Sequence, residues 1–177
     1  MAADTPSSHS HRHASSHRKS WSDYLPLIVV LAVTALAASA AYYADGSAAG
    51  TMIWMHDFMG FFLLVFAMLK LFDLPGFADG FQMYDLLAKP FRPYALAYPF
   101  IELALGLGYL SRWRSDLVYP ATVIVMTFGA LGVIRALQRG LDIHCACMGN
   151  TLKVPLSTVA LVEDLGMAGM AAFMWLA

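Results

Sequence analysis

Residues 25–43 read Leu-Pro-Leu-Ile-Val-Val-Leu-Ala-Val-Thr-Ala-Leu-Ala-Ala-Ser-Ala-Ala-Tyr-Tyr, and only Thr34 and Ser39 interrupt this apolar run. At about 1.5 Å per residue, a helix of this length crosses a hydrocarbon core about 30 Å thick. Over the whole chain of 177 residues, 59% are apolar and 13% are charged, with a mean hydropathy of +0.61. The sequence therefore predicts an integral membrane protein in contact with the lipid bilayer.

Four further segments have the length and composition of membrane-spanning helices. Together with the first run they give five predicted spans, at about residues 25–43, 52–72, 94–110, 117–137 and 156–177. The predicted fold class is all-α, an integral membrane helical bundle. Charges and prolines exclude a span between residues 73 and 92, where Phe77, Phe81 and Tyr84 recur at helical spacing. We expect a short amphipathic helix there, lying in the membrane surface.

The amino-terminal residues 1–23 are polar and of low complexity, and they cannot bury enough apolar surface to fold. We predict a disordered cytoplasmic tail, followed by a membrane domain formed by residues 24–177. One interpretation of the tail is a solvated segment without a ligand. The other is transition-metal binding by neutral imidazoles, supplied by His9, His11, His13 and His17.

The positive charges are unequally divided between the two sides of this bundle. The tail, the second loop and the fourth loop each carry three of the eleven Lys and Arg residues, and the third loop carries the other two. Because positively charged loops stay in the cytoplasm, we expect a cytoplasmic amino terminus and an extracytoplasmic carboxyl terminus in the inner (plasma) membrane. The formal net charge of −1 gives no field that would attract nucleic acid.

The two cysteines of the chain, Cys145 and Cys147, are separated by one residue in the fourth loop, which is predicted to be cytoplasmic. Thiols in the cytoplasm are kept reduced, but a bridge across so short a ring is strained and exchanges easily. His144 and Arg139 can favour the reactive thiolate. Three interpretations stay open: thiol–disulfide exchange, binding of a soft metal together with His144 or Met148, and two inert small hydrophobes.

Ionisable side chains within the predicted spans are informative because a charge in hydrocarbon is costly. Glu102 lies near the middle of the third span, followed by Gly106 and Gly108, which permit close helix approach. Glu163 and Asp164 lie seven or eight residues into the last span. Each of these carboxyl groups needs a partner or a proton. For Glu102 and Glu163, bundle-locking hydrogen bonds and proton or thiol chemistry both stay open.

Two further ionisable pairs lie near the ends of the second span. Lys70 and Asp73 are three residues apart and can pair on one helical face, as anchors with Lys70 reaching to the membrane interface. His56 and Asp57 lie near the outer end, and we expect them to be interfacial.

Three segments of the chain resemble one family. The run from Arg139, Arg-Gly-Leu-Asp-Ile-His-Cys-Ala-Cys-Met-Gly, is similar to the Asp-Ile-x-Cys-x-Cys-x-Gly signature of the MauE/DoxX family of redox-associated membrane proteins. The run from Lys70, Lys-Leu-Phe-Asp, resembles the end of that family's first core helix. The run from Tyr98, Tyr-Pro-Phe-Ile-Glu-Leu, resembles the Pro-x-x-Glu-Leu start of the next core helix. The resemblance covers roughly residues 52–176.

The resemblance implies a four-helix core, here preceded by an additional N-terminal span. It also implies a role in disulfide formation or maturation of an exported partner, which in the MauE case is the small, disulfide-rich subunit of methylamine dehydrogenase. The residues that it singles out are Lys70, Asp73, Glu102, Asp142, Cys145, Cys147 and Gly149.

Two functional hypotheses follow. In the first, the protein is a membrane thiol–disulfide oxidoreductase or maturation factor whose redox pair, Cys145 and Cys147, is supported by Glu102 and Asp142. It would act on a protein partner or exchange electrons with a thiol donor, and we predict no cofactor because no NAD or flavin fingerprint is present. In the second, the protein binds Cu(I) or Zn(II) through His144, both cysteines and the tail histidines. A purely structural subunit is a third interpretation.

Overall fold

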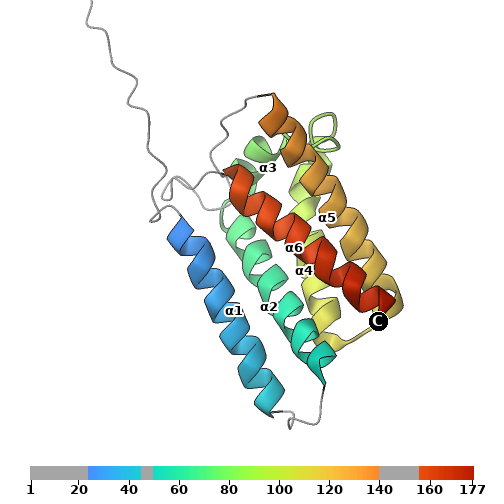
Figure 1. Ribbon diagram of the computed structural model, residues 1–177. Helices are drawn as coiled ribbons and strands as arrows, with labels where there is room; N and C mark the ends of the chain where they lie inside the picture. The colour runs from blue at the N-terminus through green and yellow to red at the C-terminus, as the bar shows by residue number, and fades with distance from the viewer. Residues whose placement is uncertain (1–23, 45–49, 140–155) are drawn as a thin grey trace, which may run out of the picture.

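The computed structural model describes residues 24–44, 50–139 and 156–177, with the side chains of the last segment described from residue 160 onward. These residues form helices and contain no strand, which confirms the predicted all-α class (Figure 1). The elements in chain order are α1 (Leu25–Ala44), α2 (Thr51–Phe72), α3 (Leu74–Phe81), α4 (Arg92–Ser111), α5 (Ser115–Gln138) and α6 (Leu156–Leu176).

Three of these helices, α1, α2 and α5, are long and apolar enough to cross a membrane. They correspond to three of the five predicted spans. The two other long helices, α4 and α6, have 20 and 21 residues and lie beside them in the same bundle (Figure 1). Both carry ionisable side chains that are buried inside the protein, namely Glu102, Glu163 and Asp164.

The core of the bundle is formed by α2, α4, α5 and α6. The most extensive contacts are those of α5 with α6 and of α2 with α4. Phe58, Phe62 and Phe66 follow one face of α2 at i, i+4 spacing, with ring centroids 5.8 and 4.6 Å apart. All three rings are buried, so this face of α2 forms the centre of the hydrophobic core.

The close approach of α2 and α4 depends on glycine. A Cβ atom on Gly106 would lie 3.1 Å from the carbonyl oxygen of Gly60, and one on Gly60 would lie 3.1 Å from the carbonyl oxygen of Gly106. The two backbones are therefore almost in contact, as small residues allow between membrane helices. Gly108 faces a different neighbour, because its Cβ would lie 2.8 Å from a methyl group of Val118 in α5.

The helix α1 lies outside this core and packs mainly on α2, as the blue and teal ribbons of Figure 1 show. Its outer face is apolar and exposed, with Leu25, Ile28, Val29, Val33 and Leu36 each about half or more exposed. A surface of this kind is suited to lipid contact. Two polar side chains of α1 are satisfied within the protein, because Thr34 donates to the carbonyl oxygen of Val30 and Ser39 accepts from the indole of Trp54.

The amphipathic helix expected between residues 73 and 92 is shorter than predicted. It ends at Phe81, and the chain continues in turns through Tyr84. Its apolar face contacts protein, because Phe77 and Phe81 are buried with ring centroids 6.2 and 4.6 Å from that of Tyr98 in α4. The helix α3 therefore packs against one end of the bundle, the upper end in Figure 1.

Candidate functional site

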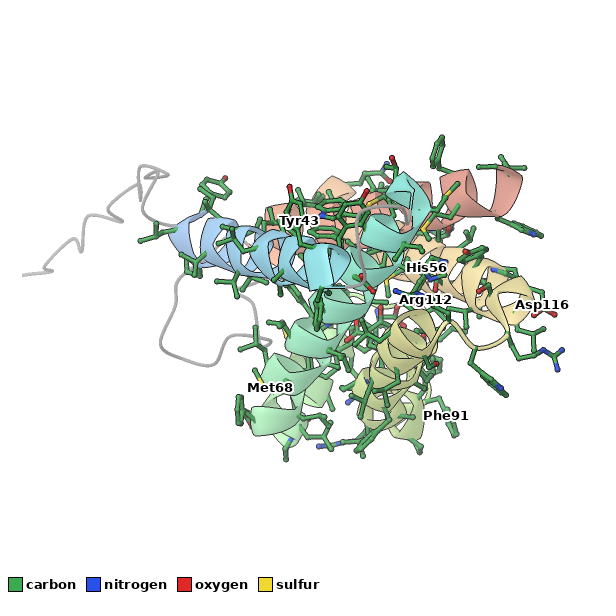
Figure 2. The ribbon with its side chains drawn as sticks, turned by 90° about the horizontal axis from the view of Figure 1, so that it is seen from below. Tyr43, His56, Met68, Phe91, Arg112 and Asp116 are labelled. Carbon is green, nitrogen blue, oxygen red and sulfur yellow. The ribbon has the colours of Figure 1, made fainter. Side chains whose placement is uncertain are left out.

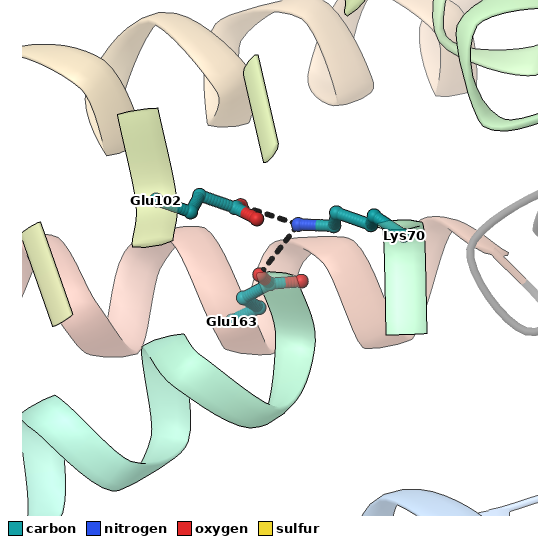
Figure 3. Close-up of polar contacts among 3 residues, drawn as sticks. All are labelled: Lys70, Glu102 and Glu163. Atoms are coloured by element: carbon teal, nitrogen blue, oxygen red, sulfur yellow. Dashed lines mark hydrogen bonds and ion pairs between the residues drawn. The ribbon is translucent and has the colours of Figure 1, made fainter. Parts of the chain in front are cut away.

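A buried ion cluster connects three helices at the end of the bundle where α3 lies. Lys70, near the end of α2, donates hydrogen bonds to Glu102 of α4 and Glu163 of α6 (Figure 3). The distance from Lys70 Nζ to Glu163 Oε1 is 2.9 Å. Lys70, Glu102 and Glu163 are 4%, 0% and 3% exposed, respectively, so the three groups are shielded from solvent. We call these three residues the Lys70 cluster.

This geometry corrects the predicted pairing of Lys70 with Asp73, and the ammonium is buried within the protein. Lys70 points into the bundle, whereas Asp73 follows the end of α2 and accepts a hydrogen bond from the backbone nitrogen of Gly76 at 3.0 Å. A buried ammonium needs carboxylate partners that are buried with it, because each uncompensated charge carries a large desolvation cost. Glu102 and Glu163 meet this need and Asp73 does not.

Aromatic rings complete the surroundings of the Lys70 ammonium. Its Nζ lies 5.6, 5.7 and 5.3 Å from the ring centroids of Phe66, Phe77 and Tyr98. These distances are within the range of cation–π attraction. The rings come from α2, α3 and α4, so the ammonium is enclosed by the same elements that close this end of the bundle.

The carboxyl groups outnumber the cations in this region. Asp164, next to Glu163 in α6, is 5% exposed, and Glu102 Oε2 has no hydrogen-bond partner within the described residues. A cavity of about 20 Å³ lined by Lys70, Glu163 and Asp164 is large enough for one water molecule. If Lys70 and all three carboxyl groups were ionised, two negative charges would stay uncompensated in a medium of low dielectric constant. The arrangement is therefore suited to holding and exchanging a proton.

Tyr84 lies between this small cavity and a larger cavity of about 190 Å³ at the end of the bundle, and it lines both. Loss of hydration raises the pKa of the Tyr84 phenol well above its ordinary value, so the hydroxyl keeps its proton. Burial also raises the pKa of Asp85, against the opposing effect of backbone hydrogen bonds from Ala88 and Leu87 at 2.7 and 2.8 Å. Two protonatable side chains thus lie between the Lys70 cluster and the surface.

A second polar cluster lies at the other end of α2, the end that faces the viewer in Figure 2, where His56 and Arg112 are labelled. His56 Nε2 lies 2.5 Å from Tyr119 Oη, and its Nδ1 lies 3.4 Å from the carbonyl oxygen of Tyr109. Because a carbonyl only accepts, Nδ1 carries the hydrogen and Nε2 accepts from the phenol. Asp57 Oδ1 lies 3.5 Å from Arg112 Nη2. We call these five residues the His56 cluster.

His56 and Asp57 are more deeply placed than an interfacial position implies, at 8% and 4% exposed. The reason is the packing of α4 and α5 over the first turns of α2, which brings Tyr109 and Tyr119 onto the imidazole ring. Arg112, by contrast, keeps a side chain that is 42% exposed. The His56 cluster therefore extends from the core to the surface.

Among the ionisable residues singled out in the sequence, Lys70, Glu102 and Glu163 lie in the Lys70 cluster. The candidate redox and metal-binding residues are outside the described residues, and their roles stay predictions: Asp142, His144, Cys145, Cys147, His9, His11, His13 and His17. Within the described ranges, no group of three or more His, Cys, Asp and Glu side chains could hold a metal ion.

The cysteine-containing segment, residues 140–155, lies outside the described residues. In the chain it follows Arg139, directly after the end of α5 at Gln138, and precedes α6, which begins at Leu156. Both helix ends lie at the upper end of the bundle in Figure 1, close to α3. The two described helix ends that flank the cysteine-containing segment thus lie at the same end of the bundle as α3.

The pairing of Lys70 with Glu102 and Glu163 was missed by the sequence analysis, although a signal for it was present. Lys70 lies near the end of the second predicted span, and the two glutamates lie less than ten residues from the start of the third and fifth spans. In a bundle of alternating direction these positions have similar depths. A search for opposite charges at similar depths in different spans would have predicted the contact of Lys70 with the two glutamates.

These features define an all-helical membrane protein whose core helices are joined by a buried ion cluster and whose last two helices are linked by a Cys-x-Cys segment. The family model described as Methylamine utilisation protein MauE matches residues 48–177, and the chain belongs to this family. The match begins just before α2 and leaves α1 outside it. No match was found among curated proteins or among solved structures.

Proposed function

We propose that this MauE-family protein supports the maturation of a protein partner by thiol–disulfide exchange at Cys145 and Cys147. The observation that carries the proposal is the position of the pair in the chain. In the sequence the cysteines lie between α5 and α6, and the flanking ends of these two helices are at the same end of the bundle as α3. Membership of the MauE family supports the same role, and the small, disulfide-rich subunit of methylamine dehydrogenase is the partner that the resemblance implies.

The proposed topology has five spans in the inner membrane, formed by α1, α2, α4, α5 and α6. The inclusion of α4 and α6 is supported by the inward direction of their carboxyl groups, which contact Lys70 and not lipid. This removes the main cost of placing such helices in hydrocarbon. The distribution of Lys and Arg favours a cytoplasmic amino terminus and a cytoplasmic cysteine segment.

The proposed chemistry requires no bound cofactor. A thiolate of one cysteine attacks a sulfur of a disulfide and forms a mixed disulfide, and the second cysteine then displaces the remaining thiolate. Two electrons and two protons pass in each exchange, so one dithiol is oxidised as one disulfide is reduced. A second exchange, with a thiol or disulfide of another protein, returns Cys145 and Cys147 to their starting state.

Glu102 acts in this proposal as a positioning residue. Together with Lys70 it fixes Glu163, which lies two turns into α6, the helix that directly follows the cysteine segment. Asp142, three residues before Cys145, is proposed to support the thiol pair within the segment itself.

The test is a redox titration of purified protein in lipid nanodiscs, with the thiols alkylated and counted by intact mass. The wild-type protein should show one reversible two-electron transition in thiol–disulfide buffers. The variants Cys145→Ser and Cys147→Ser should lack it, whereas the control Met148→Leu should retain it. A pair that stays reduced across the whole range of potentials would contradict the proposal.

The same preparation tests the metal alternative. Stoichiometric binding of Cu(I) or Zn(II), lost in the double Cys→Ser variant or on deletion of residues 8–17, without any reversible disulfide, would favour metal binding over thiol exchange. In cells, the double Cys→Ser variant should abolish maturation of the partner if the proposed exchange is its function.

A further inference from the structure

Three cations line the larger cavity at the end of the bundle. The cavity has a volume of about 190 Å³ and lies between residues 83–89 and the last turns of α5. Lys89, Arg135 and Arg139 line it, and all three are exposed. Within the described residues, none of these side chains forms an ion pair, whereas Arg92 and Arg114 pair with Asp79 and Asp116.

The carboxylate in the cavity lining does not neutralise these cations. Asp85 is 1% exposed, and its Oδ1 accepts hydrogen bonds from the backbone nitrogens of Leu87 and Ala88. Among the described lining residues, three cations thus face one acidic side chain. Tyr84 also lines the cavity, and its phenol stays protonated. Guanidinium forks and an ammonium in a concave site match the oxygens of a phosphate group.

The position of the cavity and the surface beside it indicate which phosphate compound fits. Arg135 lies in the last turn of α5, a helix long and apolar enough to cross a membrane, so the cavity lies at the depth of lipid headgroups. The apolar side chain of Met83, which lines the cavity, is 56% exposed. A ligand with one phosphate and apolar chains would contact both kinds of surface.

We propose that this cavity binds the phosphate headgroup of an anionic phospholipid, whose acyl chains lie along the apolar surface beside it. Lys89, Arg135 and Arg139 contact the phosphate oxygens, and Met83 and Leu86 contact the glycerol and the first methylenes. None of the residues that line the cavity is a cysteine, so phospholipid binding can be measured separately from thiol exchange. A bound phospholipid would hold residues 83–89 against the end of α5.

The experiment is native mass spectrometry of the full chain in detergent with added phosphatidylglycerol or phosphatidylcholine. The wild-type protein should retain phosphatidylglycerol preferentially. The double variant Arg135→Gln with Arg139→Gln should weaken this retention by about tenfold or more, because charge-assisted hydrogen bonds to the phosphate are lost. The control variant Arg92→Gln with Arg114→Gln removes the same charge from exposed ion pairs and should change retention by less than about twofold.

A second variant and a competition experiment test the same lipid site independently. Lys89→Gln changes a residue outside the helices, so it tests the site even if the arginine variant does not fold. Inorganic phosphate is added as a competitor: if it displaces phosphatidylglycerol at equal concentration, the site recognises phosphate alone and the lipid proposal is wrong. Equal retention of both lipids by the wild type, or equal loss in the cavity variant and the control, would also overturn it.

Discussion

The Lys70 and His56 clusters lie on the same helix, fourteen residues apart, yet they satisfy buried polar groups in different ways. At about 1.5 Å per residue, roughly 20 Å separate them along α2. The Lys70 cluster pairs a buried cation with two buried carboxyl groups and is closed to solvent. The His56 cluster uses a neutral imidazole, two tyrosines and an ion pair whose arginine reaches the surface.

The difference shows that the burial of a polar group decides how much stability is lost when its partner is removed. Removing one member of a fully buried ion pair leaves an uncompensated charge, whereas a group near the surface can turn to water. Between them the two clusters connect α2 to α4, α5 and α6, the helices of the family match, and neither includes α1. The four-helix core should therefore depend on the Lys70 cluster most strongly.

The largest effect is expected for Lys70→Met, which keeps the side-chain length and removes the cation. Glu102 and Glu163 are then buried without a partner, and the free energy of unfolding should fall by about 3–5 kcal/mol. Denaturant unfolding in mixed micelles measures this. Adding Glu102→Gln and Glu163→Gln to the same chain should recover much of the loss. Wild-type stability of Lys70→Met would contradict the importance assigned to this cluster.

A smaller loss is expected for Gly106→Ala, which separates α2 from α4 between the two clusters. The added Cβ would lie 3.1 Å from the Gly60 carbonyl oxygen and 3.2 Å from Leu63 Cβ. Overpacking of this kind costs about 1–3 kcal/mol. Gly166→Ala and Gly169→Ala are matched controls, because a Cβ there meets nothing within 4 Å. Equal stability of all three variants would show that α2 and α4 do not need their close approach.

Tyr119→Phe tests the His56 cluster. It removes the hydroxyl that donates to His56 Nε2 while it keeps the ring, and we expect a loss of about 1 kcal/mol. The unfolding measurement used for Lys70→Met allows a direct comparison of the two ends of α2. A loss as large as that of Lys70→Met would remove the distinction drawn between the clusters.

The smallest effect is expected in the pH dependence of stability, through Asp85 between the Lys70 cluster and the surface. Its pKa is raised from an ordinary value of 3.8, mainly by burial, so the folded state favours the protonated form. The contribution of Asp85 to the free energy of unfolding is fully present below about pH 3.8 and is lost as the pH rises through the raised pKa. Asp85→Asn should flatten the stability profile in that interval. A profile unchanged by the substitution would contradict this assignment.

The fold was largely predictable because apolar runs of about twenty residues permit few structures in a membrane. The same reasoning found the buried carboxyl groups, because a charge within an apolar span stands out in any sequence. It did not find their partners. Lys70 and Asp73 are neighbours in sequence, and the local rule favoured that pair, whereas the contact of Lys70 with Glu163 joins residues 93 positions apart. Such contacts depend on helix order and depth, which spacing alone does not give.

The extent of α3 was mispredicted for a related reason. Phe77, Phe81 and Tyr84 continue a helical spacing, but the helix ends at Phe81 and the chain continues in turns. In these turns the buried Asp85 carboxylate accepts hydrogen bonds from the backbone nitrogens of Leu87 and Ala88. A side-chain carboxylate that satisfies nearby backbone groups favours a turn over a continued helix, and the apolar pattern carried no information about it.

The proposed function requires that Cys145 and Cys147 cycle between dithiol and disulfide on the cytoplasmic side of the membrane. Labelling with a membrane-impermeant maleimide, in intact cells and in inverted membrane vesicles, with and without prior reduction, tests it most directly. We expect no labelling in intact cells, and labelling in inverted vesicles that increases after reduction. Labelling of intact cells, or the same labelling in vesicles before and after reduction, would contradict the claim.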